Sequence, residues 1–212
     1  MISSTKKTFY FLAGAVTVLF LASCASTKIT SVWMDQGKAG TSFYDILVIG
    51  IAEKEHNRRL FEEELTSQLN AAGIESEVSY RILPEGTSIT RETVGDAIEG
   101  KNIDAVIVTH MVGVEEETVY RQNMDYRPTY GYYNSMYSYY PHVHTYVNNP
   151  GYYTTYDVVM LETNLYEVST AELVWSAQSR SFAPESAKEV IDDLIKLVIK
   201  DLKEKGLIKP KA

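Results

Sequence analysis

The chain has 212 residues and a net charge of −8, with 28 acidic against 20 basic side chains. This acid excess makes nucleic acid a poor partner, because phosphate binding needs clustered cations. Cys24 is the one cysteine of the sequence. We therefore expect no disulfide within the chain and no second thiol for redox or thiolate catalysis.

The N-terminus has the layout of a secretory signal. Lys6 and Lys7 precede an apolar run at residues 9–22. That run is too short for a comfortable membrane span, which needs roughly 20 apolar residues. Small residues and then Cys24 follow the run. We interpret residues 1–23 as a signal peptide.

Residues 21–24, Leu-Ala-Ser-Cys, resemble the lipobox of bacterial lipoproteins. The resemblance implies cleavage before Cys24, diacylation of its sulfur, and a lipid anchor in the cell envelope. The alternative is an ordinary signal peptide that holds a buried-type cysteine. No aspartate follows Cys24, which by resemblance to sorting signals favours a periplasm-facing position on the outer membrane. Residues 24–28 form a tether, and the mature chain carries a charge of −10, because residues 1–23 hold two lysines and no acid.

The first half of the remaining domain, residues 29–212, mixes strand and helix patterns. Residues 29–33 alternate apolar and polar, and residues 46–51 are a continuous apolar run typical of a strand covered on both faces. Residues 78–82 alternate again, and Thr90 is placed to cap a short helix that ends near Glu99. The intervening helix begins near Asn57, ends at Gly73, and has an inward face of Leu60, Phe61, Leu65, Leu69 and Ala72.

The second half predicts more strands and a long terminal helix. Residues 105–108 form a fully apolar strand and residues 113–121 a less buried one, whereas residues 156–168 and 173–176 form a hairpin. The last helix begins near Pro184, a favoured first-turn residue, and Gly206 suits its C-terminal cap. Its buried stripe is Ala187, Val190, Ile191, Leu194, Val198 and Leu202.

This order predicts a single domain of the α+β or α/β class. We expect one mixed β-sheet with βαβ units followed by an antiparallel hairpin, helices packed on the sheet, and a long C-terminal helix. Trp33 and Trp175 each lie in an alternating strand and are expected to be core residues. Arg58, Arg59 and the acids at residues 62–64 are expected on the solvated face of the first helix, or on a partner surface.

Several segments together resemble a family of uncharacterised bacterial lipoproteins. They are the lipobox and residues 46–50, 58–73, 79–84, 104–109, 165–166, 173–176 and 206–208. The element order is also similar to the N-terminal domains of the periplasmic protein TolB and the curli secretion lipoprotein CsgG. These relatives imply roles in assembly, scaffolding or secretion. The chain lacks obvious pore-forming transmembrane hairpins, which argues against a channel of the CsgG kind.

Twelve of the 16 tyrosines fall between Tyr120 and Tyr156. We predict a tyrosine-rich loop insertion at about residues 122–155, longer than ordinary connections and therefore either functional or disordered. Tyrosine is a rigid amphipathic ring that binding loops use heavily. A recognition loop, a flexible low-complexity extension and an aromatic membrane contact are the alternatives. The candidate partner-binding residues are Tyr130, Tyr132, Tyr133, Tyr137, Tyr139 and Tyr140.

We expect no metal, no cofactor and no catalysis. His142 and His144 share a face only if the segment is extended, and Asp125 and Asp157 are further ligands by composition alone. His110 follows an apolar strand and residues 115–117 are three glutamates, yet a structural histidine and a solvated acidic face explain both.

The sequence thus predicts a lipid-anchored envelope lipoprotein that binds or scaffolds without catalysis. Its expected partners are the membrane, through the lipid, and an envelope protein. The alternative is a glycan- or peptidoglycan-binding module that uses the same tyrosines, and an envelope hydrolase is more distant.

Overall fold

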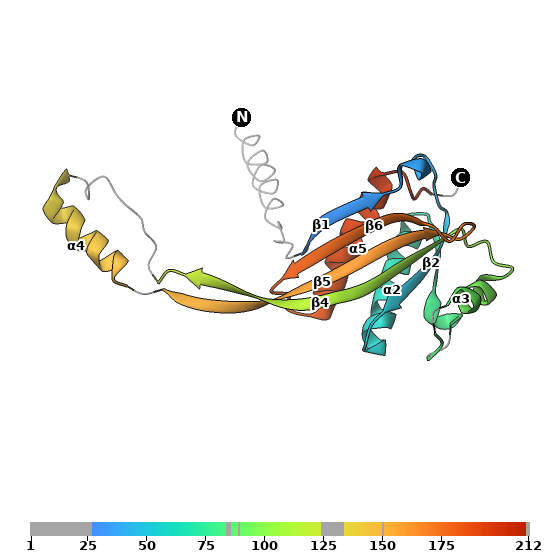
Figure 1. The fold of residues 1–212 in the computed structure, drawn as a ribbon, viewed down its shortest axis with the longest axis horizontal. Helices are drawn as coiled ribbons and strands as arrows, with labels where there is room; N and C mark the ends of the chain where they lie inside the picture. Colours follow the sequence, from blue (N-terminus) through green and yellow to red (C-terminus); the bar gives the residue numbers. More distant parts are fainter. Residues whose placement is uncertain (1–26, 84–85, 89, 124–133, 150, 211–212) are drawn as a thin grey trace, which may run out of the picture.

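The computed structural model describes residues 27–83, 86–88, 90–123, 134–149 and 151–210. Cys24, Asp125, Tyr130, Tyr132 and Tyr133 lie outside these described residues. The described chain forms one six-stranded mixed sheet with helices packed on it (Figure 1). This arrangement confirms the predicted fold class.

The sheet combines a parallel half and an antiparallel half. In space the strands follow the order β1-β6-β5-β4-β2-β3. Strand β2 pairs in parallel with β3 and β4, as the βαβ pattern predicts, and the other pairs are antiparallel. The strands are β1 (Thr27–Met34), β2 (Asp45–Ile51), β3 (Glu75–Val78), β4 (Ala105–Arg121), β5 (Tyr152–Glu167) and β6 (Leu173–Phe182).

The helices cover the two faces unequally. Helices α2 (Glu55–Ala71) and α5 (Ala187–Glu204) pack on one face and enclose the main core with it (Figure 1). Helix α3 (Arg91–Ile98), with Ile82 and Leu83, covers β2 and β4 on the other face. A short 3₁₀ turn, η2 (Ser79–Arg81), follows β3. A second 3₁₀ turn, η1 (Gln36–Lys38), follows β1. Among the described residues, no helix is long and apolar enough to cross a membrane.

Helix α5 has the predicted apolar stripe but starts later than predicted. Ser186 caps it by accepting a hydrogen bond from the backbone N–H of Glu189, so Pro184 precedes the helix and Ala187 is exposed. A serine cap satisfies a terminal N–H, which proline does not. The buried residues are Val190, Ile191, Leu194, Ile195, Val198, Ile199 and Leu202.

Two further predictions were wrong in detail. Trp33 is 51% exposed, because it lies on the edge strand β1 and points to the face opposite α2 and α5. Trp175 points toward those helices, is fully buried as predicted, and donates from Nε1 to Asp201 at 2.8 Å. Residues 79–81 turn as η2 instead of continuing the strand that ends at Val78.

Strand β4 and the tyrosine-rich segment also differ from the prediction. The two strands expected at residues 105–108 and 113–121 are one 17-residue strand. A β-bulge between Met111 and Gly113 keeps the strand continuous by absorbing one extra residue. The predicted loop contains a helix, α4 (Met136–Val147), and its last residues belong to β5.

Candidate contact surface

Strands β4 and β5 extend beyond their neighbours in the sheet. Strand β2 leaves β4 at His110, and β6 leaves β5 at Val158. Residues 117–121 and 152–156 therefore pair only with each other among the described residues, and we call them the ribbon. Within the described part of the chain, no strand pairs with either outer edge of the ribbon. Such free edges are a template for adding another strand. Figure 1 shows the ribbon projecting from the sheet with α4 beyond its end; ribbon and α4 together are the arm.

Few side-chain contacts hold the ribbon. The Tyr120 and Tyr153 rings lie 5.2 Å apart on one face, beside a 3.1 Å hydrogen bond between the hydroxyls of Thr118 and Thr155. The Tyr120 hydroxyl accepts a hydrogen bond from the N–H of Gly151 at 2.9 Å. A Cβ at Gly151 would collide with the Tyr120 ring, which explains a glycine there. An isolated two-stranded ribbon is marginally stable in water, so this one depends on its root or on a partner.

Ion pairs join the start of the ribbon to the neighbouring strand β6. Arg180 of β6 lies 3.4 Å from a carboxylate oxygen of Glu115 and 3.6 Å from one of Glu117. Tyr156 packs on Phe182 with ring centroids 5.0 Å apart. The acidic run at residues 115–117 is exposed, as the sequence predicts. On β4 these contacts with β6 end at residue 117. Beyond it, the side-chain contacts of the ribbon are between its own two strands.

Helix α4 is capped locally and has an internal defect. The Ser135 hydroxyl accepts from the N–H of Ser138 at 3.2 Å, and the Asn148 side chain donates to the carbonyl of His144 at 2.8 Å. Pro141 lies inside the helix. Because proline removes a backbone donor and clashes with the preceding turn, it weakens a helix by about 3 kcal/mol. A helix of this length is marginal without packing.

The tyrosines that the sequence singled out are exposed on α4 where the structure describes them. Tyr137 is 84% exposed and Tyr140 64%, and Tyr139 lies on another side of the helix at 39%. On the ribbon Tyr153 is 73% exposed. The structure thus brings these rings onto one arm, although it places them on a helix and a strand.

The histidines considered as metal ligands were expected to share a face only in an extended segment. His144 is helical and packs on Tyr140 with ring centroids 5.6 Å apart. The segment that holds these histidines is helical and not extended, so the condition for a shared face is not met. Asp157 belongs to β5. Among the described residues, no three His, Cys, Asp or Glu side chains form a group that could hold a metal ion.

A polar row crosses the sheet at the position of His110. His110 lies directly opposite Glu162 on β5. Glu162 accepts hydrogen bonds from Asn164 at 2.9 Å and from Gln178 at 3.2 Å. These two bonds, with a smaller contribution from His110, hold the pKa of Glu162 below its ordinary value, while partial burial acts in the opposite direction. His110 is therefore a cross-strand neighbour of a carboxylate.

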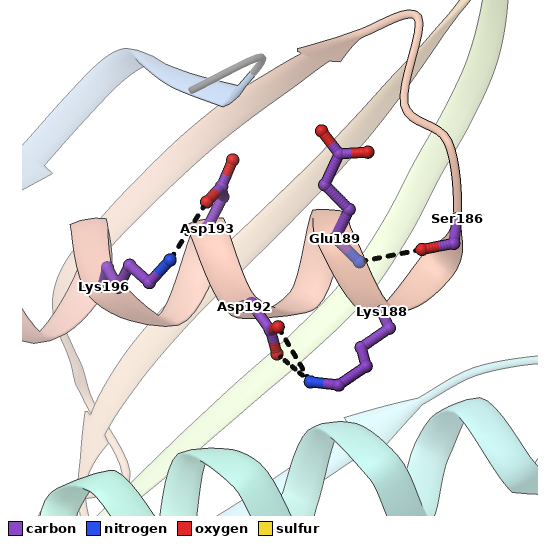
Figure 2. Close-up of a pocket in the computed structure, with 6 residues that line it drawn as sticks. All are labelled: Ser186, Lys188, Glu189, Asp192, Asp193 and Lys196. Atoms are coloured by element: carbon purple, nitrogen blue, oxygen red, sulfur yellow. Dashed lines mark hydrogen bonds and ion pairs between the residues drawn. The ribbon is translucent and has the colours of Figure 1, made fainter. Parts of the chain in front are cut away.

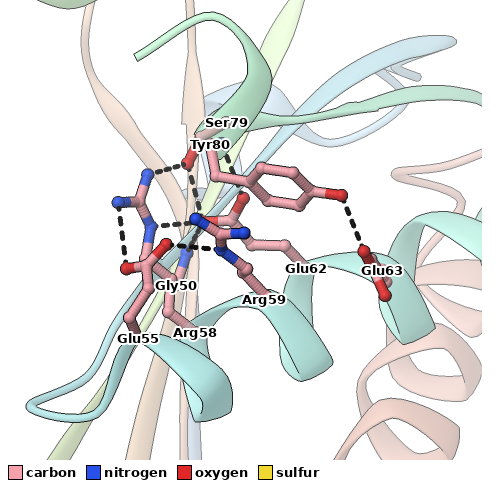
Figure 3. Close-up of polar contacts among 8 residues, drawn as sticks. All are labelled: Gly50, Glu55, Arg58, Arg59, Glu62, Glu63, Ser79 and Tyr80. Carbon is pink, nitrogen blue, oxygen red and sulfur yellow. Dashed lines mark hydrogen bonds and ion pairs between the residues drawn. The ribbon is translucent and has the colours of Figure 1, made fainter. Parts of the chain in front are cut away.

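A second cluster, which the sequence analysis missed, surrounds a buried carboxylate. Glu62 of α2 is fully buried, whereas the sequence placed it on the solvated face. Its Oε1 accepts from the Ser79 hydroxyl at 2.6 Å and from Arg58 Nε at 3.0 Å. Its carboxylate also accepts from the N–H groups of Gly50 and Tyr80, both at 3.0 Å. Figure 3 shows these contacts converging from α2, β2 and η2.

This Glu62 cluster lies at the carboxyl ends of the parallel strands β2 and β3, where α/β proteins often bind ligands. Here the donors are already used within the chain. Arg58 also donates to Ser79 at 3.0 Å, and a Cβ at Gly50 would lie 3.2 Å from the Phe61 ring. The close packing and the satisfied carboxylate identify a clamp between helix and strands. Glu62 lies three and seven residues before the buried Leu65 and Leu69, a helical spacing that signalled its burial.

A shallow hollow lies on the outer surface of α5 (Figure 2). It is lined by Ser186, Lys188, Glu189, Asp192, Asp193 and Lys196. Lys188 contacts Asp192 at 2.8 Å and Lys196 contacts Asp193 at 3.3 Å. Ion pairs three or four residues apart are ordinary on an exposed helix face. The arm therefore remains the better candidate for a contact surface.

Comparisons with known proteins give fold likenesses of low similarity. No family model matches the sequence, and no curated protein matches it either. Similar solved structures include the PelC dodecamer from Paraburkholderia phytofirmans, at 15% identity and a TM-score of 0.43, with 84% of this chain and 97% of that chain covered. Another is Lipoprotein GNA1162 from Neisseria meningitidis, at 12% identity and a TM-score of 0.41, with 76% and 99% covered. The neighbours thus include a lipoprotein, and the likeness to TolB and CsgG stays a prediction.

Proposed function

We propose that this protein is a lipid-anchored lipoprotein of the cell envelope, held at the outer membrane by Cys24 and facing the periplasm. It acts without catalysis, as a binding or scaffolding component, and the arm is its contact surface. The signal at residues 1–24 supports this location in the cell envelope. The projecting ribbon with its two free edges is the observation that carries the binding role.

The composition of the arm supports this role. Protein interfaces are rich in tyrosine and methionine and poor in charged residues at their centre. Residues 128–156 contain no Asp, Glu, Lys or Arg, in a chain that is otherwise 23% charged. Exposed Tyr137 and Tyr153 are large rings that lose little entropy on binding. Free strand edges add backbone hydrogen bonds to a bound segment.

In-cell photo-crosslinking tests the proposal. A photo-reactive amino acid at Tyr153 is expected to capture one discrete envelope protein, identified by mass spectrometry. The same amino acid at Lys196, which is 66% exposed on α5, is the matched control on the body of the molecule. Cys24→Ala is expected to remove the capture by removing the anchor. Equal capture from both positions, or capture from neither, would contradict the arm as the contact surface.

Glycan binding is the alternative, and the exposed rings of Tyr137 and Tyr140 are the observation that favours it. A glycan binder should sediment with purified peptidoglycan sacculi and release them when both tyrosines become alanine. Retention on sacculi with no protein crosslink from Tyr153 would replace the protein-scaffold proposal with this one.

A further inference from the structure

Helix α4 has an apolar stripe that is exposed except at the half-buried Val143. Met136, Tyr140, Val143 and Val147 follow at intervals of four, three and four residues, which places them on one face. Met136 and Val147 are each 69% exposed. Ser138 and Thr145 occupy the opposite face, so the helix is amphipathic without being charged.

The arm leaves the sheet at the same end as the tether. Thr27, the first residue of β1, pairs with Ser181, which pairs with Val159, which pairs with Val114. These four residues form one row across the sheet, about 14 Å wide at the usual strand spacing. In Figure 1 the start of β1 lies near the point where β4 and β5 leave the sheet.

The tether was predicted at residues 24–28, but residues 27 and 28 already belong to β1, so the tether is shorter than predicted. Cys24 and Thr27 are three residues apart, a span of at most about 11 Å for extended chain. From Val114 to Arg121 the strand runs for seven residues, about 23 Å, and α4 follows. This stretch of β4 is twice as long as the tether and leaves the sheet at the same end, so the arm at its tip is long enough to reach a bilayer to which Cys24 is anchored.

We propose that α4 lies in the interface of the lipid bilayer, with the stripe of Met136, Tyr140, Val143 and Val147 turned toward the acyl chains. This inference rests on the proposed anchor at Cys24. Tyrosine favours the headgroup level, and amphipathic helices bind there through their apolar face. The acidic remainder of the chain is repelled by anionic headgroups, whereas residues 128–156, which include α4, carry no charged side chain. With its tip on the membrane, the arm holds the ribbon at a fixed height for a partner.

An environment-sensitive fluorophore on a single thiol tests this placement. Because Cys24 carries the lipid, an introduced cysteine is the one free thiol of the mature protein. Val147→Cys places the probe on the stripe, and Thr145→Cys, two residues away on the opposite face, is the matched control. Each labelled lipoprotein is reconstituted into vesicles of phosphatidylethanolamine and phosphatidylglycerol, and flotation with the vesicles measures anchoring in the same sample.

At position 147 we expect a blue-shifted emission and several-fold stronger quenching by lipids with quenchers on their acyl chains than at position 145. A protein that floats while both probes stay equally in water overturns the placement of α4 and leaves the anchor intact. A probe at 147 that is shielded but not quenched by lipid means that protein, such as a second copy, covers the stripe, and this also overturns the proposal. A protein that does not float overturns the anchor and the inference together.

Discussion

The two halves of β4 differ in burial. In its first half Ala105 and Ile107 are fully buried between β2, β5 and the helices. After the bulge Val114 is 53% exposed and Tyr120 50%. The first half is enclosed in the core, whereas the second half is mostly exposed, and among the described residues its end at 117–121 pairs only with β5. The outer half therefore adds little to the stability of the sheet, and contact with another surface is a physical reason for its length.

The largest expected effect comes from a matched pair of substitutions on this strand. Ile107→Ala deletes fully buried methyl groups and is expected to lower the free energy of unfolding by about 4 kcal/mol. Val114→Ala, at an exposed position of the same strand, is expected to change it by less than about 0.5 kcal/mol. Urea unfolding of both variants measures the difference, and similar losses would contradict the division of β4 into a buried and an exposed half.

The next effect concerns the clamp around Glu62. Glu62→Ala leaves Arg58 and Ser79 without their shared acceptor and is expected to cost about 3 kcal/mol, because breaking a buried ion pair exposes the full desolvation penalty. Glu63→Ala, on the same helix, loses one exposed hydrogen bond to Tyr80 and is expected to cost at most about 1 kcal/mol. If thermal unfolding found the two variants equal, the clamp would not stabilise the body.

A smaller effect is expected from acid titration of the polar row. The hydrogen bonds from Asn164 and Gln178 lower the pKa of Glu162 in the folded state. Its stabilising contribution is therefore complete above the ordinary glutamate pKa of about 4.3 and is lost as the pH falls through the lower folded value. Glu162→Gln should flatten this part of the stability–pH curve, whereas an unchanged acid slope would assign the loss to other carboxylates.

The body of the fold could be read from the sequence because its signals are local. The apolar run at residues 46–51 predicted the buried strand β2, and the helical spacing from Val190 to Leu202 predicted the buried face of α5. The predictions of burial were wrong where tertiary packing, and not the local sequence pattern, determines which side chains are exposed. Trp33 is exposed because its edge strand turns it away from the helices, and Glu62 is buried because strand N–H groups meet it.

Composition located the arm in the sequence but did not predict its secondary structure. The concentration of tyrosines marked the right segment, whereas glycine, asparagine and Pro141 argued for a loop. The spacing of Met136, Tyr140, Val143 and Val147 was a helical signal that proline obscured. The length of the ribbon follows from pairing between Tyr120 and Tyr153, residues far apart in the chain, and single-sequence periodicity does not report such pairing.

Amide hydrogen exchange, measured on the isolated protein and on the protein in its envelope membranes, tests most directly whether the arm is completed by contact. In the isolated protein we expect strong protection in β2 and the first half of β4, and rapid exchange in the ribbon and α4. In the envelope the ribbon and α4 should gain protection while the body stays the same. An arm that is as protected as the rest of the domain in isolation, or equally unprotected in the envelope, would contradict its proposed role as a contact surface.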